Sequence, residues 1–305
     1  MVDDPRTRGG GNDRLMRWAT YLSVTVAVAM VAAKLVAWVL TGSVALMSTL
    51  VDSTLDGIAS IVNLLAVRHA LQPADQDHRF GHAKAEPLAG LGQSAFISGS
   101  ALFLVGQAIE RLFAPEPINN AGIGIAVMAV SIVATLLLVL FQRHVVRRTG
   151  SLAIGADHLH YSGDLAMNAA VIVSLLLSSQ LGITVADPLF TLGIAGFLVY
   201  GAARIALRSY NLLMDREFPQ AQRQLIETIC LAHSEVRDVH DLRTRSAGLK
   251  DFIQVHLSMD PNITLLQAHA ISDEVEARIQ DAFPAADVII HQDPAGVPEP
   301  RSAVV

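Results

Sequence analysis

The sequence has few charged residues, few aromatic residues and a single cysteine. Charged residues make up 16% of its 305 positions, against the roughly 25% of soluble domains. Hydrophobic residues make up 52% of the chain and gather in long blocks up to about residue 210. This composition excludes an ordinary soluble protein and predicts a polytopic membrane protein with a soluble C-terminal part.

The other scarcities exclude further classes. The one cysteine, Cys230, excludes an internal disulfide and a zinc cluster made of cysteines, and its apolar helical surroundings predict a core position. The chain lacks the glycine-rich motif with a lysine that binds ATP phosphates, which disfavours an ATP-driven pump. Aromatic residues are only 5% of the chain, so the aromatic pocket of a proton-coupled drug exporter is not expected.

Charge is distributed unevenly along the chain. Residues 1–210 carry 14 Lys+Arg and 13 Asp+Glu, a net charge of +1, whereas residues 211–305 carry 8 and 15, a net charge of −7. An acidic C-terminal part disfavours nucleic acid as a partner and suits cations. Residues 1–13 are polar, and we expect them to be disordered. They lack the apolar core of a cleavable signal peptide, so the first apolar segment is expected to direct insertion.

Six apolar segments lie within residues 14–210. Each has the ~20 residues that a membrane helix needs, and only helices satisfy the backbone of such segments in lipid. We expect the second and fifth to score poorly on hydropathy, because they carry ionisable residues. The approximate limits are 15–40, 43–68, 86–112, 121–146, 153–179 and 186–209.

The placement of Lys and Arg indicates the orientation. These residues gather before the first segment, between the second and third, between the fourth and fifth, and after the sixth. Near the opposite links lies only Arg111. Because positive links face the cytoplasm, both termini are expected to be cytoplasmic.

Residues 211–293 are expected to form a small cytoplasmic α+β domain. The order αββαβ suits a two-layer architecture, and the tail over residues 294–305 is Pro-rich and expected to be disordered. The predicted elements are a helix over Pro219–Ser234, strands over Val236–Arg245 and Leu249–Met259, a helix over Thr264–Phe283 and a strand over Ala286–His291.

Two pairs of ionisable residues interrupt the apolar segments. Asp52 and Asp56 lie in the second segment, and His160 and Asp164 in the fifth. A spacing of four residues puts each pair on one helix face. At ~1.5 Å per residue, Asp52 and Asp56 lie roughly 14 and 20 Å from the outer side. His160 and Asp164 lie roughly 10 and 17 Å from the inner side. In a core ~30 Å thick they reach similar depth, so all four side chains can meet.

Three carboxylates and one imidazole suit a tetrahedral Zn²⁺ site. Imidazole favours borderline ions such as Zn²⁺ over Mg²⁺ or Ca²⁺; Cd²⁺ is a plausible second substrate and Fe²⁺ a weaker one. Metal binding requires deprotonated ligands and releases protons, so alternate exposure of this site would give antiport. The rival interpretation, buried salt bridges, is disfavoured because neither the second nor the fifth segment offers these residues a Lys or Arg partner.

Neighbouring polar residues receive structural roles. Asp157 is expected to line the cytoplasmic entrance or cap its helix. Lys34 is expected to extend along the first segment toward the outer face. Asn63 and Asn168 are expected to form hydrogen bonds between helices. Lys84 could pair with Asp215 and tie the membrane domain to the soluble one.

Two further groups of residues suggest metal sites outside the membrane. Asp75, His78 and His82 lie in the link after the second segment, where an ordinary polar loop is the alternative. The soluble part holds several histidines and a carboxylate that could form one or two zinc sites, although single histidines are often plain surface residues. This group comprises His240, His256, His269, His291 and Asp293; His233, at a helix end, is left out.

On these residues the chain resembles the cation diffusion facilitator transporters, and within them the bacterial zinc, cadmium and ferrous-iron efflux pumps. The resemblance covers about residues 14–294. It is carried by the Asp-x-x-x-Asp and His-x-x-x-Asp pairs, by the six segments with a C-terminal αββαβ domain, and by stretches such as Phe80-Gly81-His82 and Ile289-Ile290-His291-Gln292-Asp293-Pro294. Relatives with a long His-rich loop between the fourth and fifth segments differ, because here that link is short and basic.

The resemblance implies a homodimeric proton antiporter in the bacterial inner membrane that exports divalent cations. It implies a transport site of Asp52, Asp56, His160 and Asp164, and a loop site of Asp75, His78 and His82. It further implies a salt bridge between Lys84 and Asp215. It also implies a binuclear zinc site between two soluble domains whose fold is metallochaperone-like, with Asp293 bridging. The residues of this site would be His240, His256, His269, His291 and Asp293.

The expected function is therefore Zn²⁺ export without enzymatic activity and without an organic cofactor. Two alternatives stay open at this point. One is a membrane metal sensor or scaffold that does not transport, and the other is an exporter that prefers Fe²⁺ or Mn²⁺.

Overall fold

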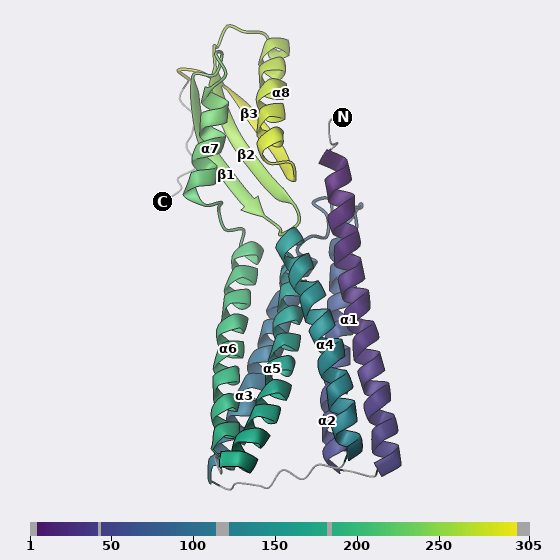
Figure 1. The fold of residues 1–305 in the computed structure, drawn as a ribbon. Coiled ribbons are helices and arrows are strands. Elements are labelled where there is room, and N and C mark those ends of the chain that lie inside the picture. The colour runs from purple at the N-terminus through teal and green to yellow at the C-terminus, as the bar shows by residue number, and fades with distance from the viewer. Residues whose placement is uncertain (1–4, 42–43, 114–121, 182–184, 298–305) are drawn as a thin grey trace. The chain divides into compact units, whose positions relative to one another are not determined.

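The structure is a computed structural model that describes residues 5–41, 44–113, 122–181 and 185–297. The chain forms two compact units, Met1–Tyr210 and Asn211–Val305. The first contains the long helices and the second a small sheet with two shorter helices (Figure 1). Each unit is described by itself.

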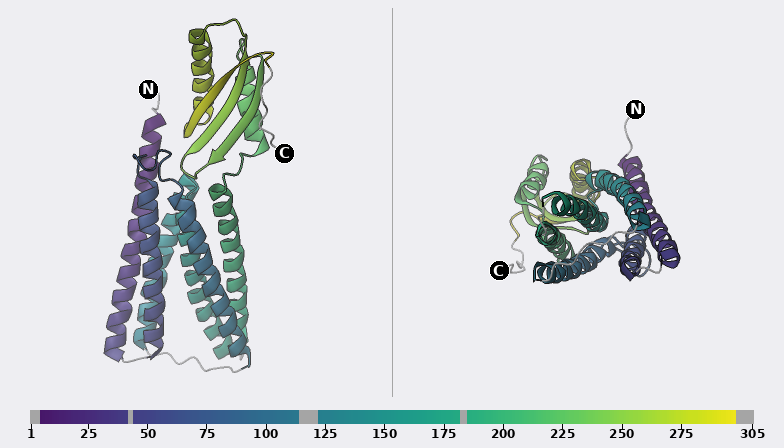
Figure 2. Two further views of the ribbon diagram at one scale, coloured as in Figure 1. Left: turned by 180° about the vertical axis from the view of Figure 1, so that it is seen from behind. Right: turned by 60° about the horizontal axis from the view of Figure 1, so that its bottom comes forward.

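Six long helices build the first unit, as the apolar segments predict. They run side by side in Figure 2 and follow the expected limits to within a few residues at most ends. The helices are α1 Pro5–Thr41, α2 Val44–Ala70, α3 Ala85–Phe113, α4 Gly122–Thr149, α5 Leu152–Leu181 and α6 Ala186–Leu213.

Five of these helices are long and apolar enough over their described residues to cross a membrane: α1, α2, α3, α4 and α6. The expectation that α2 would fail this criterion is wrong, because its apolar residues outweigh its two aspartates. α5 is not among them over its described residues, and since part of this helix lies outside those residues, the expectation that it scores poorly stays a prediction. It is nonetheless a continuous 30-residue helix.

The N-terminus differs from expectation. Residues 5–13 belong to α1, which begins at Pro5, whereas the sequence led us to expect disorder over residues 1–13. Proline is favourable at the first helical position, and extending an existing helix costs little once it is nucleated. The polar segment therefore continues the helix of the first span.

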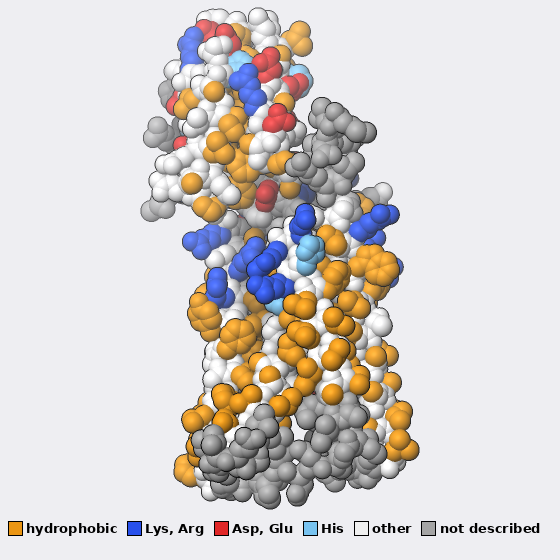
Figure 3. Space-filling view, in the orientation of Figure 1, with side chains coloured by type: hydrophobic (Ala, Val, Ile, Leu, Met, Phe, Trp, Pro, Cys, Tyr) orange, Lys and Arg blue, Asp and Glu red, His pale blue; other side chains and the backbone are white. Residues whose placement is uncertain are grey.

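Apolar side chains cover most of the described face of the bundle, and Lys and Arg gather at one end of it (Figure 3). Within the bundle, α1 packs along α2 and α4, while α5 packs against α4 and α3. α6 contacts α5 and α3 through a buried group that includes Ile97, Leu159 and Leu198. α5 is thus held on several sides, which fixes the side chains it carries.

The second unit has the predicted order αββαβ. Its sheet is ordered β1-β2-β3, with β1 antiparallel and β3 parallel to β2. Thr264 and Gln267 form a capping box at the start of α8, the expected beginning of that helix. The elements are α7 Gln220–Leu231, β1 Asp238–Ser246, β2 Asp251–Met259, α8 Leu265–Ala282 and β3 Ala286–Pro294.

The strand β3 is longer than predicted. It reaches Pro294, where the sequence led us to expect a disordered tail, and Ala295 N donates to Met259 O at 2.8 Å. Proline is tolerated here because β3 is an edge strand. The extension brings Asp293 onto the sheet. Residues 298–305 lie outside the described residues.

Alternation along β2 builds the core of this unit. Val255, Leu257 and Met259 are buried, while His256 and Ser258 between them are partly exposed. Cys230 on α7 is fully buried in the same core, as predicted. The polar face of β2 is therefore free to carry functional side chains.

Candidate metal centre

Four helices of the bundle, α1, α2, α4 and α5, surround a cavity of about 210 Å³. Its wall carries three carboxylates, from Asp52 and Asp56 on α2 and from Asp164 on α5. A concentration of acidic groups within a bundle of apolar helices makes this cavity a candidate ion site.

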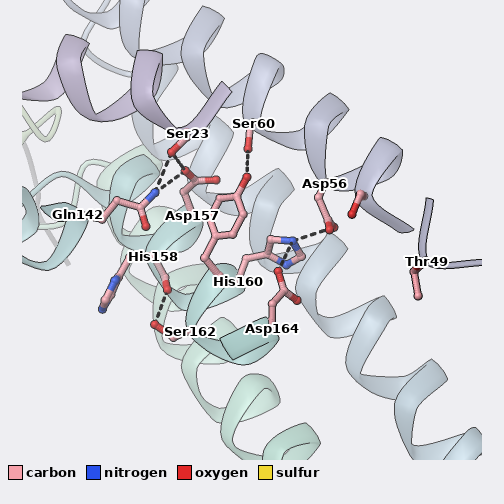
Figure 4. Close-up of polar contacts among 12 residues, drawn as sticks. Ser23, Thr49, Asp56, Ser60, Gln142, Asp157, His158, His160, Ser162 and Asp164 are labelled. Atoms are coloured by element: carbon pink, nitrogen blue, oxygen red, sulfur yellow. Dashed lines mark hydrogen bonds and ion pairs between the residues drawn. The ribbon is translucent and has the colours of Figure 1, made fainter. Parts of the chain in front are cut away.

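His160 joins two of these carboxylates (Figure 4). Its Nε2 lies 2.9 Å from Asp56 Oδ1 and 3.7 Å from Asp164 Oδ2. One ligand atom from each of the three residues lies within 4.8 Å of the others. The rings of Phe96 and Tyr161 flank the imidazole at centroid distances of 5.7 and 5.5 Å. The geometry suits one ion bound by nitrogen and oxygen donors.

Asp52 lies one turn from Asp56 along α2 and lines the same cavity. The close group consists of the other three residues, so Asp52 lies beside it. The three predicted aspartates therefore line one cavity, and His160 lies within ligand distance of two of them, Asp56 and Asp164. Their role in metal binding stays a prediction.

Lys34 occupies a different place from the one expected. Instead of extending to the outer face, it lines the cavity, where its Nζ donates to Ser53 Oγ at 2.6 Å and to Thr49 O at 3.2 Å. A cation therefore reaches the acidic pairs from the first segment, which the absence of a partner in the second and fifth segments did not predict. A lysine in the middle of an apolar run was the available signal.

Asp157 also differs from expectation. It is 1% exposed and takes part in a buried network in place of lining an entrance. Its Oδ2 accepts from Ser23 Oγ at 2.6 Å and from Gln142 Nε2 at 2.7 Å (Figure 4). The cap of α5 comes instead from Ser151, whose Oγ accepts from Ile154 N.

A second buried bond lies close to this network. Ser60 Oγ and Tyr161 Oη are 2.9 Å apart and join α2 to α5 (Figure 4). With Ser23 on α1 and Gln142 on α4, polar bonds tie all four helices that surround the cavity. Sequence reasoning missed this network, because serine and glutamine are common in helix interfaces.

The two asparagines do not both follow their predicted role. Asn168 lines the cavity. Asn63 is 3% exposed, and in the described part of the chain its Nδ2 has no hydrogen-bond partner. An interhelical hydrogen bond from this nitrogen is therefore not observed.

Asp75, His78 and His82 come together in the link between α2 and α3. Asp75 Oδ1 lies 3.4 Å from His78 Nδ1, and its Oδ2 lies 3.3 Å from His82 Nε2. The backbone N–H of His78 donates to Asp75 and holds the pKa of that carboxyl below its usual value. The loop thus keeps an ionised oxygen donor beside two imidazoles.

In the sheet, three histidines form a row across the strands. His240 pairs with His256 between β1 and β2, and His256 pairs with His291 between β2 and β3. Asp293 lies among them, with its Oδ2 2.8 Å from His256 Nδ1 and 3.4 Å from His240 Nε2, and its Oδ1 3.1 Å from His291 Nε2. One carboxylate therefore meets three imidazoles, the arrangement of a bridging ligand.

His269 is not part of this row. It lies exposed on α8, with its Nε2 3.4 Å from Asp273 Oδ2. His233, which was left out, is 9% exposed and bonds Glu274 at 3.2 Å. The pairing of Lys84 with Asp215 would join the two units and stays a prediction. Within its own unit, Asp215 lies 3.4 Å from Arg245 Nη1.

Comparison with known proteins places this geometry in context. The family model described as the cation efflux transmembrane domain matches residues 20–214, and the one for the cytoplasmic domain of cation efflux proteins matches residues 218–295. The cation-efflux pump FieF of Klebsiella pneumoniae is 50% identical over 284 residues, which cover 93% of this chain and 94% of that protein.

A second relative matches this chain over the same length. FieF of Salmonella choleraesuis is 48% identical over 284 residues, with coverage of 93% and 94%. Among solved structures, the zinc form of a zinc transporter, CzrB, is 30% identical over 28% of this chain and 98% of that chain, with a TM-score of 0.26.

Proposed function

Because the chain belongs to the cation efflux family, also called the cation diffusion facilitators, we propose that it exports Zn²⁺ from the cytoplasm in exchange for protons. Members of this family are transporters of divalent metal cations and not enzymes. The observation that carries the proposal is the group of Asp56, His160 and Asp164, whose two carboxylates line a cavity within the helix bundle. Cd²⁺ is the expected second substrate, and Fe²⁺ or Mn²⁺ are the alternative ones.

The donor set supports a zinc-like ion. A single imidazole with two or three carboxylates offers the nitrogen and oxygen ligands that Zn²⁺ takes in tetrahedral sites. Ca²⁺ and Mg²⁺ prefer shells made only of oxygen. His160 is therefore the residue that distinguishes this site from one for hard cations.

Proton exchange follows from the same ligands. Three carboxylates crowded in a site of low dielectric repel each other when empty, so proton uptake relieves them. A metal ion must displace those protons, because only the deprotonated groups bind it. If the site opens alternately to each side, inward proton movement drives outward metal movement.

A flux assay in proteoliposomes tests the proposal. We expect the wild-type protein to move Zn²⁺ and protons in opposite directions. Protons should therefore appear on the side from which Zn²⁺ leaves. Asp56→Asn and His160→Gln should each lower the Zn²⁺ flux at least about tenfold, since loss of even a partner of a metal ligand typically costs about 10–100-fold. His144→Gln, an exposed histidine on α4, is the matched control and should retain the flux.

Two results would contradict this proposal. Full Zn²⁺–proton exchange by either ligand variant would exclude the site. Metal-dependent changes of the wild-type protein without any flux would favour the sensor or scaffold alternative.

The sheet and loop groups support a regulatory role for bound zinc. Three imidazoles around Asp293 suit a structural zinc site, and His269 is proposed to complete it across a homodimer. We place the protein in a bacterial inner membrane with both termini in the cytoplasm. The basic end of the bundle (Figure 3) supports this orientation, since basic links face the cytoplasm.

A further inference from the structure

Lys34 holds a positive charge beside the three carboxylates of the cavity. Among the described residues its hydrogen-bond acceptors are two neutral oxygens, Ser53 Oγ at 2.6 Å and Thr49 O at 3.2 Å. Ser53 is 6% exposed, so the anchoring hydroxyl is itself held in the packed wall. The ammonium is thus fixed near the carboxylates by groups that do not occupy them. The carboxylate oxygens remain available to a metal ion.

A charge count shows what this position does. Three ionised carboxylates carry −3, and a divalent cation brings the loaded site to −1. Among the described residues that line the cavity, Lys34 is the one lysine or arginine, and its charge brings the loaded site to zero. A net charge is costly within a membrane. The loaded site avoids this cost when the charge of Lys34 is included.

We propose that Lys34 is a resident counter-cation that lowers the affinity of the transport site for divalent cations and so speeds their release. The inference rests on the proposed transport function of the same site. A carboxylate site without an internal cation binds a divalent ion tightly and holds it. An exporter needs binding that is strong enough to load and weak enough to leave, and a fixed positive charge sets that balance.

Zinc affinity of the purified full-length protein in detergent tests the role of the charge. Competition with a chromophoric chelator gives the affinity, and the binding that Asp56→Ala removes is assigned to the transport site. Lys34→Gln should bind Zn²⁺ at least about tenfold tighter at this site, since a unit charge acts strongly on a divalent ion at low dielectric. Lys34→Arg keeps the charge and should stay within about threefold of wild type.

The control is Arg111→Gln, which removes a cation that pairs with Asp187 away from the cavity. Its zinc affinity should equal that of wild type. In proteoliposomes, Lys34→Gln should lower both the KM for Zn²⁺ and the maximal rate, because tighter binding slows release. If Lys34→Gln does not yield folded protein, Lys34→Met provides a second neutral side chain with a similar stem.

Two outcomes would overturn the inference. One is a neutral variant at Lys34 that binds Zn²⁺ no more tightly than wild type. The other is a Lys34→Arg protein that binds Zn²⁺ as tightly as Lys34→Gln does. The higher affinity would then come from the shape of the side chain and not from its charge. Failure of the transport proposal is distinct, because wild-type protein would then show no Zn²⁺–proton exchange whatever the affinities.

Discussion

At the scale of single residues, Cys230 offers a direct test of the soluble unit. The thiol is fully buried on α7, and burial raises its pKa to about 11. Only the thiolate reacts with alkylating reagents, so native protein should resist iodoacetamide at pH 8 and react once unfolded in guanidinium chloride. Mass spectrometry of the full-length protein measures the modified fraction.

The matched control moves the thiol to a neighbouring exposed position. Cys230→Ala combined with Ala232→Cys puts it where the chain is exposed, and this variant should react promptly in the native state. Because the folded pKa lies above the unfolded one near 8.5, the contribution of the buried thiol to stability is complete below pH ~8.5. It is lost as the pH rises toward 11. Equal labelling of both native proteins would contradict the assigned burial.

Other single residues show where sequence reasoning succeeds and where it stops. Asp56, His160 and Asp164 could be placed together from helix spacing and depth alone, and the structure groups them. Lys34 could not be placed, because α1 is apolar over much of its length and its sequence does not show which face turns inward. Asp157 was misplaced for a similar reason, since its partners come from two distant helices.

At the scale of elements, glycines set the distance between α5 and α6. A Cβ added at Gly163 would lie 2.7 Å from Leu198 Cδ2, and one added at Gly201 would lie 2.6 Å from Leu159 Cδ2. A glycine on each helix therefore makes room for a leucine of the other helix. Gly163→Ala and Gly201→Ala should each destabilise the protein by about 1–3 kcal/mol through overpacking, measured as a lower thermal midpoint in detergent.

The same helix provides controls. Added methyl groups at Gly193 and Gly196 on α6 would meet nothing within 4 Å. Alanine there should leave stability unchanged or raise it by up to about 1 kcal/mol through helix propensity. Gly201→Ala should also reduce Zn²⁺ flux, because Leu159 precedes His160 on α5. A Gly201→Ala protein as stable as the Gly193→Ala protein would refute the reciprocal packing.

The soluble domain shows the same limit of prediction at the level of strands. Alternation in β2 correctly put His256 on the polar face. The row of three histidines depends on strand register, and β1 has an irregularity between His240 and Arg243, with Asp241 at a φ of 43°. The alternation of polar and apolar residues does not predict such an irregularity in the pairing of two strands. The extension of β3 to Pro294 was hidden by proline's usual role as a strand breaker.

At the scale of the whole molecule, Asp293 is the residue that we expect to connect metal binding to assembly. If zinc at the sheet stabilises a homodimer, Zn²⁺ should raise the thermal midpoint of full-length protein and its dimer fraction. At a hundredfold excess over the dissociation constant, the stabilisation is about 2.7 kcal/mol. Asp293→Ala should abolish both effects, measured by thermal unfolding and analytical ultracentrifugation in detergent with and without a chelator.

The control for this prediction lies on the same strand. Asp287 pairs with Lys250 at 2.8 Å and is not part of the histidine group. Asp287→Ala should therefore keep the full response to zinc. A response that survives in Asp293→Ala would assign the zinc effect to the loop or to the membrane cavity.

The order of elements along the chain gives the histidine row a consequence for biosynthesis. β3 is the last described element in chain order, and it supplies both His291 and Asp293. Chains emerge from the ribosome N-terminal end first, so the membrane helices and their ionisable pairs are made before this row is complete. A nascent or truncated chain can thus hold the candidate transport ligands but lack the carboxylate that meets all three imidazoles. The histidine row would then distinguish finished molecules from unfinished ones.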